Sequence, residues 1–289
     1  MKLIRYGDAG KERIGVHISG VNYDASAFGG DYNELFFEDN GLARLDEFVR
    51  ANEGRLIPIP AGARIGSPVA RPSKIVGVGL NYVDHAAETG AKAPQEPVLF
   101  LKSTTSYGGP FDKIMLPENS VKTDWEVELA VVIGKKASYV KEEDAITHIA
   151  GYMLMNDVSE REYQMERGGT WDKGKGCDTF GPAGPYLVTP DEVADVHNLR
   201  LRLSVNGQVM QDGNTSNLIF KVPYLIAYIS RMMTLLPGDI IITGTPAGVG
   251  LGMKPPTFLK AGDVLEMEAE GLGKARQEVI AHRKGPFIP

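Results

Sequence analysis

Cysteine is nearly absent from this sequence, and long apolar runs and basic clusters are absent altogether. The only cysteine, Cys177, excludes an intramolecular disulfide and a zinc site built from several thiolates. The longest apolar runs, such as 129–133, are far shorter than the ~20 residues that a membrane-spanning helix needs. The formal net charge of −6 comes without a basic block, so nucleic acid and anionic membranes are poor candidate partners.

The start of the chain, MKLIRYGDAGKERIG, lacks the apolar core of a signal peptide, so we expect a cytoplasmic protein. With 43% hydrophobic and 24% charged residues, the composition excludes a disordered chain, a coiled coil and a collagen-like fibre. A length of 289 residues fits one large domain, or one domain with a smaller partner. The 34 glycines and 18 prolines indicate many turns and a β-rich fold.

Segments typical of strands outnumber those typical of helices. Strands are predicted over 2–6, 13–18, 75–80, 97–102, 123–134, 150–158, 238–246 and 262–280, and a hairpin over 199–214 with its turn at Asn206-Gly207. Helices are predicted over 42–51, 81–89, 159–168 and 222–234. We therefore expect a β-dominated α+β protein with a small N-terminal α+β domain over 1–70, a turn-rich linker over 67–74 and a main domain over 71–289.

The strongest local signal for a site is Glu126-Val127-Glu128. Residues two apart in a strand face the same side, so the two carboxylates stand roughly 7 Å apart on one face. A hard divalent cation would offset their repulsion, whereas the alternative is a solvated strand face. Asp157 ends a strand-like run and precedes a helix-like one, so it is either a third ligand or a helix N-cap.

His85 and Glu88 are three residues apart in a predicted helix and therefore neighbours on its surface. A carboxylate beside an imidazole orients it and favours its protonated form, which suits a general base near neutral pH. The alternative is an ordinary surface pair. Because the two residues follow a predicted buried strand, we expect them at the mouth of the sheet.

Four further polar residues are candidates for contact with substrate. Lys175 lies in a glycine-flanked loop that could approach an anion closely. Arg161 and Gln164 share a helix face, where one could bind a carboxylate and the other could donate to a developing oxyanion. Loop 244–250 follows a strand and could offer N–H groups and the Thr245 hydroxyl. For each, the alternative is a solvated or turn residue.

Two glycine patterns do not support nucleotide binding. Gly77-Val78-Gly79 lacks the third glycine of a dinucleotide fingerprint, and 169–175 lacks the Ser or Thr that completes a P-loop. Cys177 is interpreted as an inert small residue. The histidines outside the candidate pair have no partners at ligand spacing and are interpreted as surface or packing residues; they are His17, His148, His197 and His282.

Five motifs, in order along the chain, resemble those of the fumarylacetoacetate hydrolase superfamily. They are NYVDHAAE (81–88), DWEVELAVVIG (124–134), GYMLMNDVSERE (151–162), GKGCDTFGPAGP (174–185) and GDIIITGTPAGVG (238–250). The resemblance covers roughly residues 71–282, and the N-terminal part is similar to the small leading domain of many bacterial members. It implies a mixed β-sandwich roll, a homodimer, and one Mg²⁺ or Mn²⁺ per chain held by Glu126, Glu128 and Asp157.

The same resemblance implies roles for the other candidates. His85 and Glu88 match the family's catalytic dyad, on a segment that orders as a lid, and Lys175 matches its substrate-contacting lysine. Gln164 is implied to act in catalysis, and Arg161, Thr245 and Tyr82 to contact substrate.

The implied activity is hydrolysis of a carbon–carbon bond in a 2,4-diketo acid of the acylpyruvate type. Water, deprotonated by His85, attacks C4, and the C3–C4 bond breaks with the ion and Lys175 stabilising the pyruvate enolate. The sequence is most similar to the bacterial branch acting on 2,4-diketo-3-deoxy sugar acids, such as L-fuconate or L-rhamnonate derivatives. Alternatives are oxaloacetate decarboxylation, 2-hydroxymuconate-type isomerisation or decarboxylation, ureidoglycolate cleavage, and a metal-stabilised binding protein without turnover.

Overall fold

The computed structural model describes residues 1–88, 90 and 93–284. Its strands are β1 (Lys2–Tyr6), β2 (Arg13–Ile18), β3 (Val21–Asp24), β4 (Ile57–Pro58), β5 (Ile65–Gly66), β6 (Ile75–Gly79), β7 (Val98–Lys102), β8 (Tyr107–Gly108), β9 (Ile114–Met115), β10 (Thr123–Asp124), β11 (Val127–Ile133), β12 (Ile149–Asn156), β13 (Ser159–Glu160), β14 (Gly181–Pro182), β15 (Leu187–Val188), β16 (Arg200–Val205), β17 (Gln208–Asn214), β18 (Ile240–Ile242), β19 (Val264–Ala269) and β20 (Gly273–Ile280). Its α-helices are α1 (Glu34–Glu38), α2 (Gly41–Ala51), α3 (Val83–Glu88), α4 (Arg161–Met165), α5 (Asp172–Lys175) and α6 (Val222–Met232).

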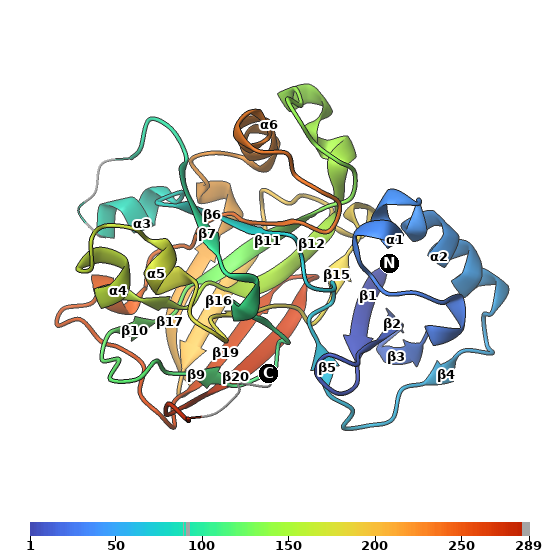
Figure 1. Cartoon of the computed structure of the whole chain (residues 1–289), viewed down its shortest axis with the longest axis horizontal. Coiled ribbons are helices and arrows are strands. Elements are labelled where there is room, and N and C mark those ends of the chain that lie inside the picture. Colours follow the sequence, from blue (N-terminus) through green and yellow to red (C-terminus); the bar gives the residue numbers. More distant parts are fainter. Residues whose placement is uncertain (89, 91–92, 285–289) are drawn as a thin grey trace.

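Two large sheets dominate the described residues, and the pairs β10-β13 and β14-β8 form two small ones. The larger has the order β4-β3-β2-β1-β15-β12-β11-β18-β6-β7, with β5 beside β1, and the smaller has the order β17-β16-β19-β20-β9. Most neighbouring strands run antiparallel, but β18 and β6, and β20 and β9, run parallel. Figure 1 shows β16, β19 and β20 crossing in front of β11 and β12. The predicted β-dominated fold with mixed sheets is confirmed.

Strand β11 lies at the centre of the larger sheet, and every one of its residues is buried. Leu129 and Val131 belong to an apolar cluster that also includes residues of β16, β19, β20 and α6. Ala130 and Val132 belong to a second cluster, which the N-terminal segment completes. Because alternate residues of a strand face opposite sides, the sheet is covered on both faces, which explains why this strand is continuously apolar.

The N-terminal segment is joined to the main part by both hydrogen bonds and packing. Strand β1 pairs with β15, with Leu3 opposite Leu187, and β15 continues the sheet to β12. Leu3 and Ile14 share the second apolar cluster with Ala130. The predicted linker over 67–74 is buried in its first three residues. A domain boundary near residue 70 stays a prediction, and the shared core makes the two parts one packing unit.

Two predicted β features differ in outcome. The hairpin turn at Asn206-Gly207 is confirmed, because both residues have positive φ values, 51° and 80°, and connect β16 to β17. The single strand predicted over 123–134 is wrong, because the structure divides it into β10 and β11. Between them the N–H of Glu126 donates to the side-chain oxygen of Asn156 on β12 instead of to a backbone carbonyl. At this break the chain passes from pairing with β13 to pairing with β12 and β18.

The helices match the predictions in part. Those predicted over 42–51 and 222–234 correspond to α2 and α6. The helix predicted over 81–89 appears as α3, and Thr89 lies outside the described residues. The helix predicted over 159–168 begins instead as the short strand β13, and α4 ends at Met165. Across the part of the chain that the structure describes, none of the helices has the length and apolarity to cross a bilayer.

Candidate metal centre and active site

Glu126, Glu128 and Asp157 converge on one point. Each offers one carboxylate oxygen, and these oxygens all lie within 4.8 Å of one another. The three residues are 5%, 2% and 0% exposed. Strand pairing explains the convergence: β11 and β12 are antiparallel, and the Asp157 N–H donates to the Glu126 carbonyl at 2.8 Å, which sets the two residues opposite each other. Glu126 and Glu128 on one segment and Asp157 on another thus form a single cluster of three carboxylates.

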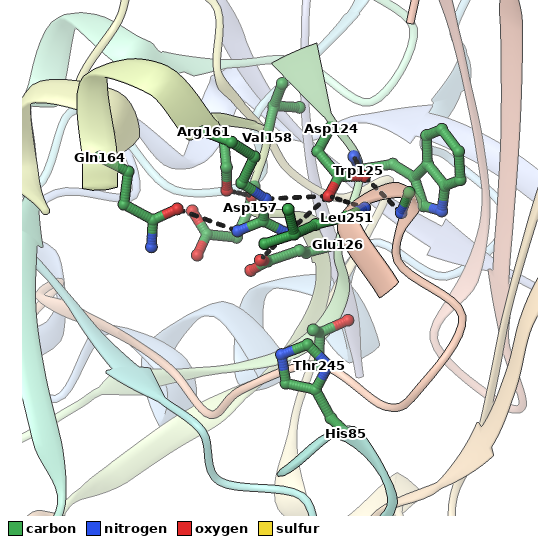
Figure 2. Close-up of polar contacts among 12 residues, drawn as sticks. His85, Asp124, Trp125, Glu126, Asp157, Val158, Arg161, Gln164, Thr245 and Leu251 are labelled. Carbon is green, nitrogen blue, oxygen red and sulfur yellow. Dashed lines mark hydrogen bonds and ion pairs between the residues drawn. The ribbon is translucent and has the colours of Figure 1, made fainter. Parts of the chain in front are cut away.

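Three buried cations surround this cluster. The Lys175 ammonium lies 2.7 Å from Glu126 and 2.6 Å from Asp157. The Lys102 ammonium, at the end of β7, lies 2.7 Å from the other oxygen of Asp157. The Arg161 guanidinium lies 2.7 Å from Glu126 and also pairs with Asp124, as Figure 2 shows. The negative charges of Glu126 and Asp157 are therefore each balanced by two cationic side chains.

Glu128 is different, because its described partner is the Gly244 N–H at 2.6 Å and none of the described cations pairs with it. Burial, together with Asp157 and Glu126, raises the pKa of Glu128 well above its usual value. Burial also acts to raise the pKa of Glu126, but Lys175 and Arg161 outweigh it and lower that pKa to about 2.

The donor set fits a divalent cation. Three carboxylates that face one another, one of them without a cationic partner, are the ligands that Mg²⁺ and Mn²⁺ prefer. An ion there would replace the missing positive charge beside Glu128. The residues predicted as ligands are therefore together, although the identity of the ion stays a prediction.

His85 and Glu88 lie on α3 beside this cluster. The His85 Nδ1 is 3.6 Å from a Glu88 oxygen. The Gly248 N–H donates to both oxygens of Glu88, at 3.0 and 3.1 Å, and fixes the carboxylate. Burial acts to raise the pKa of Glu88, but the contacts with His85 and with the Gly248 N–H outweigh it, and the pKa falls below its usual value. Figure 2 shows His85 across an open space from Glu126.

Loop 244–250 was predicted to offer its N–H groups, and it does so to the site's own carboxylates. Gly244 donates to Glu128, Gly248 to Glu88, and Gly250 to Asp124. The Thr245 hydroxyl donates to the Val127 carbonyl and accepts from the Gln211 amide. This loop therefore positions the acids, and contact between Thr245 and substrate stays a prediction.

A cavity of about 590 Å³ opens beside the cluster. Eight of the predicted site residues line it: His85, Glu88, Glu126, Glu128, Arg161, Gln164, Lys175 and Thr245. Tyr82 is not brought to the cavity lining. It is fully buried, forms an isolated bridge with Leu218, and packs in the first apolar cluster. Contact between Tyr82 and substrate therefore stays a prediction.

Two charged residues of the site were not predicted from the sequence. Lys102 is fully buried, and this burial lowers the pKa of its ammonium group despite the nearby Asp157. Asp124 accepts from the Gly250 and Leu251 N–H groups and pairs with Arg161. The available signals were a lysine ending the apolar run VLFLK and a third acid two residues before Glu126.

Cys177, two residues after Lys175 in the sequence, is expected to have a thiol of low reactivity. Burial raises the pKa of its thiol to about 11. Since only the thiolate reacts, we expect a disulfide reagent to label the folded protein at pH 8 about a hundredfold more slowly than the unfolded chain. The measurement is the labelling rate with and without denaturant, and equal rates would show an ordinary accessible thiol.

Comparison with known proteins places the chain in a family. The sequence model described as fumarylacetoacetate (FAA) hydrolase, C-terminal, matches residues 74–280. The chain belongs to the fumarylacetoacetate hydrolase family. A Burkholderia cenocepacia protein, provisionally called a hydrolase, is 53% identical over 280 residues, covering 96% of this chain and 98% of that protein.

Solved structures of the fumarylacetoacetate hydrolase family share the whole fold. A fumarylacetoacetate hydrolase from Exiguobacterium antarcticum is 35% identical with a TM-score of 0.84. A maleylpyruvate hydrolase from Sphingobium sp. SYK-6, solved with manganese(II) and pyruvate, is 31% identical with a TM-score of 0.81. A protein assigned as a 2-hydroxyhepta-2,4-diene-1,7-dioate isomerase from Mycobacterium abscessus is 32% identical with a TM-score of 0.81. Each match covers 98% of this chain and 100% of the other. The chain is thus an enzyme of a family that contains both hydrolases and isomerases.

Proposed function

We propose that the protein hydrolyses the C3–C4 bond of a 2,4-diketo acid and releases pyruvate and a second carboxylic acid. The observation that carries this proposal is the convergence of Glu126, Glu128 and Asp157 beside a cavity that also contains the His85–Glu88 pair. The similar maleylpyruvate hydrolase was solved with manganese(II) and pyruvate, which supports a metal and a pyruvate-forming reaction.

Glu126, Glu128 and Asp157 would hold the Mg²⁺ or Mn²⁺, which supplies a Lewis acid for the oxygens of a 2-oxo acid. The Lys175 ammonium adds positive charge at the same end of the cavity. His85, oriented by Glu88, takes the proton from the attacking water. The Gln164 side-chain oxygen is held by Arg161 at 3.0 Å, which leaves its amide N–H groups to stabilise the oxyanion at C4.

The reaction is balanced without a further reactant. The water oxygen bonds to the acyl carbon at C4, the C3–C4 bond breaks, and its electron pair stays on C3. Protonation of C3 then completes pyruvate, while the acyl group leaves as a carboxylate. The protein therefore needs a base for the water and positive charge at the pyruvyl end, and both are present beside the cavity.

The second candidate is an isomerase, which the similarity to the Mycobacterium abscessus protein favours. There the same base would move a proton between carbon atoms and no water would be consumed. Incubation in ¹⁸O-water separates the two reactions. Hydrolysis places the label in the new carboxylate and gives two product molecules per substrate molecule. Isomerisation incorporates no oxygen from water into a new carboxylate and gives one product molecule per substrate molecule.

The test of the proposal is pyruvate release from a panel of compounds with and without chelator. The panel contains acetylpyruvate, an aroylpyruvate, a 2,4-diketo-3-deoxy sugar acid, oxaloacetate and ureidoglycolate. We expect a 2,4-diketo acid to be cleaved, with at least about a thousandfold loss after chelation and recovery with Mn²⁺ or Mg²⁺. Activity that survives thorough chelation would contradict the metal site, and binding without any turnover would favour a binding protein. The homodimer stays a prediction that light scattering can test.

A further inference from the structure

Apolar side chains make up much of the cavity lining. Phe100, Trp171, Met165, Leu251, Met253 and Val78 belong to it, together with the charged residues of the site. The rings of Phe100 and Trp171, whose centres are 5.7 Å apart, form an aromatic wall in this lining.

The backbone of β6 is shaped to seat the two aromatic rings. A Cβ atom on Gly77 would lie 2.1 Å from the Phe100 ring, and a Cβ atom on Gly79 would lie 2.2 Å from the Trp171 ring. Any side chain at either position would displace the ring that covers it. The Gly77-Val78-Gly79 pattern, which does not mark a nucleotide site, therefore makes room for the aromatic wall.

The wall is continuous with the charged centre. The Lys175 ammonium lies 4.9 Å from the centre of the Phe100 ring, and that ring lies 5.7 Å from the Trp171 ring. The same ammonium contacts Asp157 and Glu126. A ligand with its 2-oxo acid at the carboxylates would therefore extend along Phe100 toward Trp171.

Apart from Lys254 and the amide N–H groups of Gln164, most polar side chains of the lining are hydrogen-bonded or paired within the protein. The Thr245 hydroxyl both donates and accepts, Glu88 is held by Gly248, and Arg161 contacts Asp124, Glu126 and Gln164. Away from the charged centre, a ligand carrying several hydroxyl groups would lose hydration and find few new partners, which is costly.

We propose that the Phe100–Trp171 wall binds the acyl group of the substrate, and that this group is a planar hydrocarbon, aryl or conjugated alkenyl, not a polyhydroxylated chain. The proposal rests on the proposed function and replaces the expectation of a sugar acid. Trp171 is the specificity-determining residue, because its ring offers a large flat apolar face beside the Phe100 ring.

Binding of non-hydrolysable 2-oxo acids to the Mn²⁺-loaded protein tests the proposal by calorimetry. The probes lack a 4-keto group: pyruvate, 2-oxo-4-phenylbutanoate, a 2-oxo-3-deoxy sugar acid and 2-oxoadipate. We expect the phenyl compound to bind at least about tenfold more tightly than pyruvate, as burial of a ring predicts. The other two should gain less than about threefold, because they bring polar groups to an apolar wall.

Two variants test the contribution of the aromatic wall to binding independently of the charged centre. Trp171→Ala should reduce the preference for the phenyl compound to about threefold or less and leave the affinity for pyruvate unchanged. Gly79→Ala should have the same effect by pushing the Trp171 ring into the cavity. Tyr139→Ala, which removes a 77% exposed aromatic ring outside the cavity lining, is the matched control and should change nothing.

The outcomes distinguish this inference from the proposed function. Equal or tighter binding of the sugar acid or of 2-oxoadipate would overturn the inference, and so would a full phenyl preference in folded Trp171→Ala protein. Metal-dependent binding of pyruvate in those same experiments would leave the proposed function standing. If no 2-oxo acid binds in a metal-dependent way, the proposed function and the inference fail together.

Discussion

Glu128→Gln is expected to abolish the stabilisation of the protein by Mn²⁺ without lowering the stability of the metal-free protein. The glutamine oxygen can still accept from the Gly244 N–H, which is the described partner of Glu128. The change replaces a buried carboxyl group that faces Glu126 and Asp157 and whose pKa burial and these neighbours raise. Without metal, the neutral amide avoids the repulsion that a charged Glu128 would meet, and with metal the change removes one of three anionic ligands.

Thermal unfolding with and without Mn²⁺ measures this effect. A ligand at a hundredfold excess over its Kd stabilises the folded state by about 2.7 kcal/mol, so the wild-type melting temperature should rise by several degrees. The same variant should lose about a thousandfold in kcat/KM if the metal lowers the barrier by several kcal/mol. Glu266→Gln, an exposed position on β19, is the control. A full Mn²⁺ shift in Glu128→Gln would contradict the metal assignment.

Glu126 would be a less decisive choice for the same experiment. It pairs with both Lys175 and Arg161, which are buried. Removing its charge would leave both cations partly uncompensated, and breaking a buried pair costs about 3–5 kcal/mol by itself. Loss of the metal shift in a Glu126 variant would therefore be mixed with loss of the fold.

The set of three ligands came from the family motifs, and local strand pattern alone did not determine it. Alternation with the apolar residues Trp125, Val127 and Leu129 made Glu126 and Glu128 candidates for one face, but a solvated face stayed open for them and a helix N-cap stayed open for Asp157. The break between β10 and β11 could not be predicted, because it depends on the side chain of Asn156 taking over a backbone hydrogen bond. Such an exchange between distant segments leaves no periodic signal.

The supporting charges depend on tertiary contacts in the same way. Lys102 reaches Asp157 across 55 positions of the chain, and the loop residue Gly248 reaches Glu88 across 160. The sequence shows that these residues exist, but their pairing follows from which strands become neighbours. For the same reason the joining of the N-terminal segment to the main sheet through β1 and β15 was not apparent from local pattern.

His85→Asn is expected to lower kcat for hydrolysis of a 2,4-diketo acid by about 10²–10⁴-fold while leaving the Kd for pyruvate within about twofold. Asparagine retains a polar group but cannot take a proton from water. The pyruvate affinity should persist because the carboxylate cluster and the Lys175 ammonium beside it do not include His85, which Figure 2 shows apart from Glu126 and Asp157. Single-turnover kinetics and calorimetry provide the two measurements.

Glu88→Gln refines this test, because hydrolysis needs an activated water and decarboxylation of oxaloacetate does not. The glutamine oxygen can keep accepting from the Gly248 N–H, but the charge that orients the imidazole is lost. Hydrolysis should fall by about tenfold to a hundredfold, and decarboxylation by much less. Equal losses of the two activities would mean that the dyad acts on a step they share, such as proton transfer at C3, and not on water. Retention of hydrolysis in His85→Asn would remove the dyad from the mechanism, since no other part of this geometry pairs an imidazole with a fixed carboxylate at the cavity among the residues described.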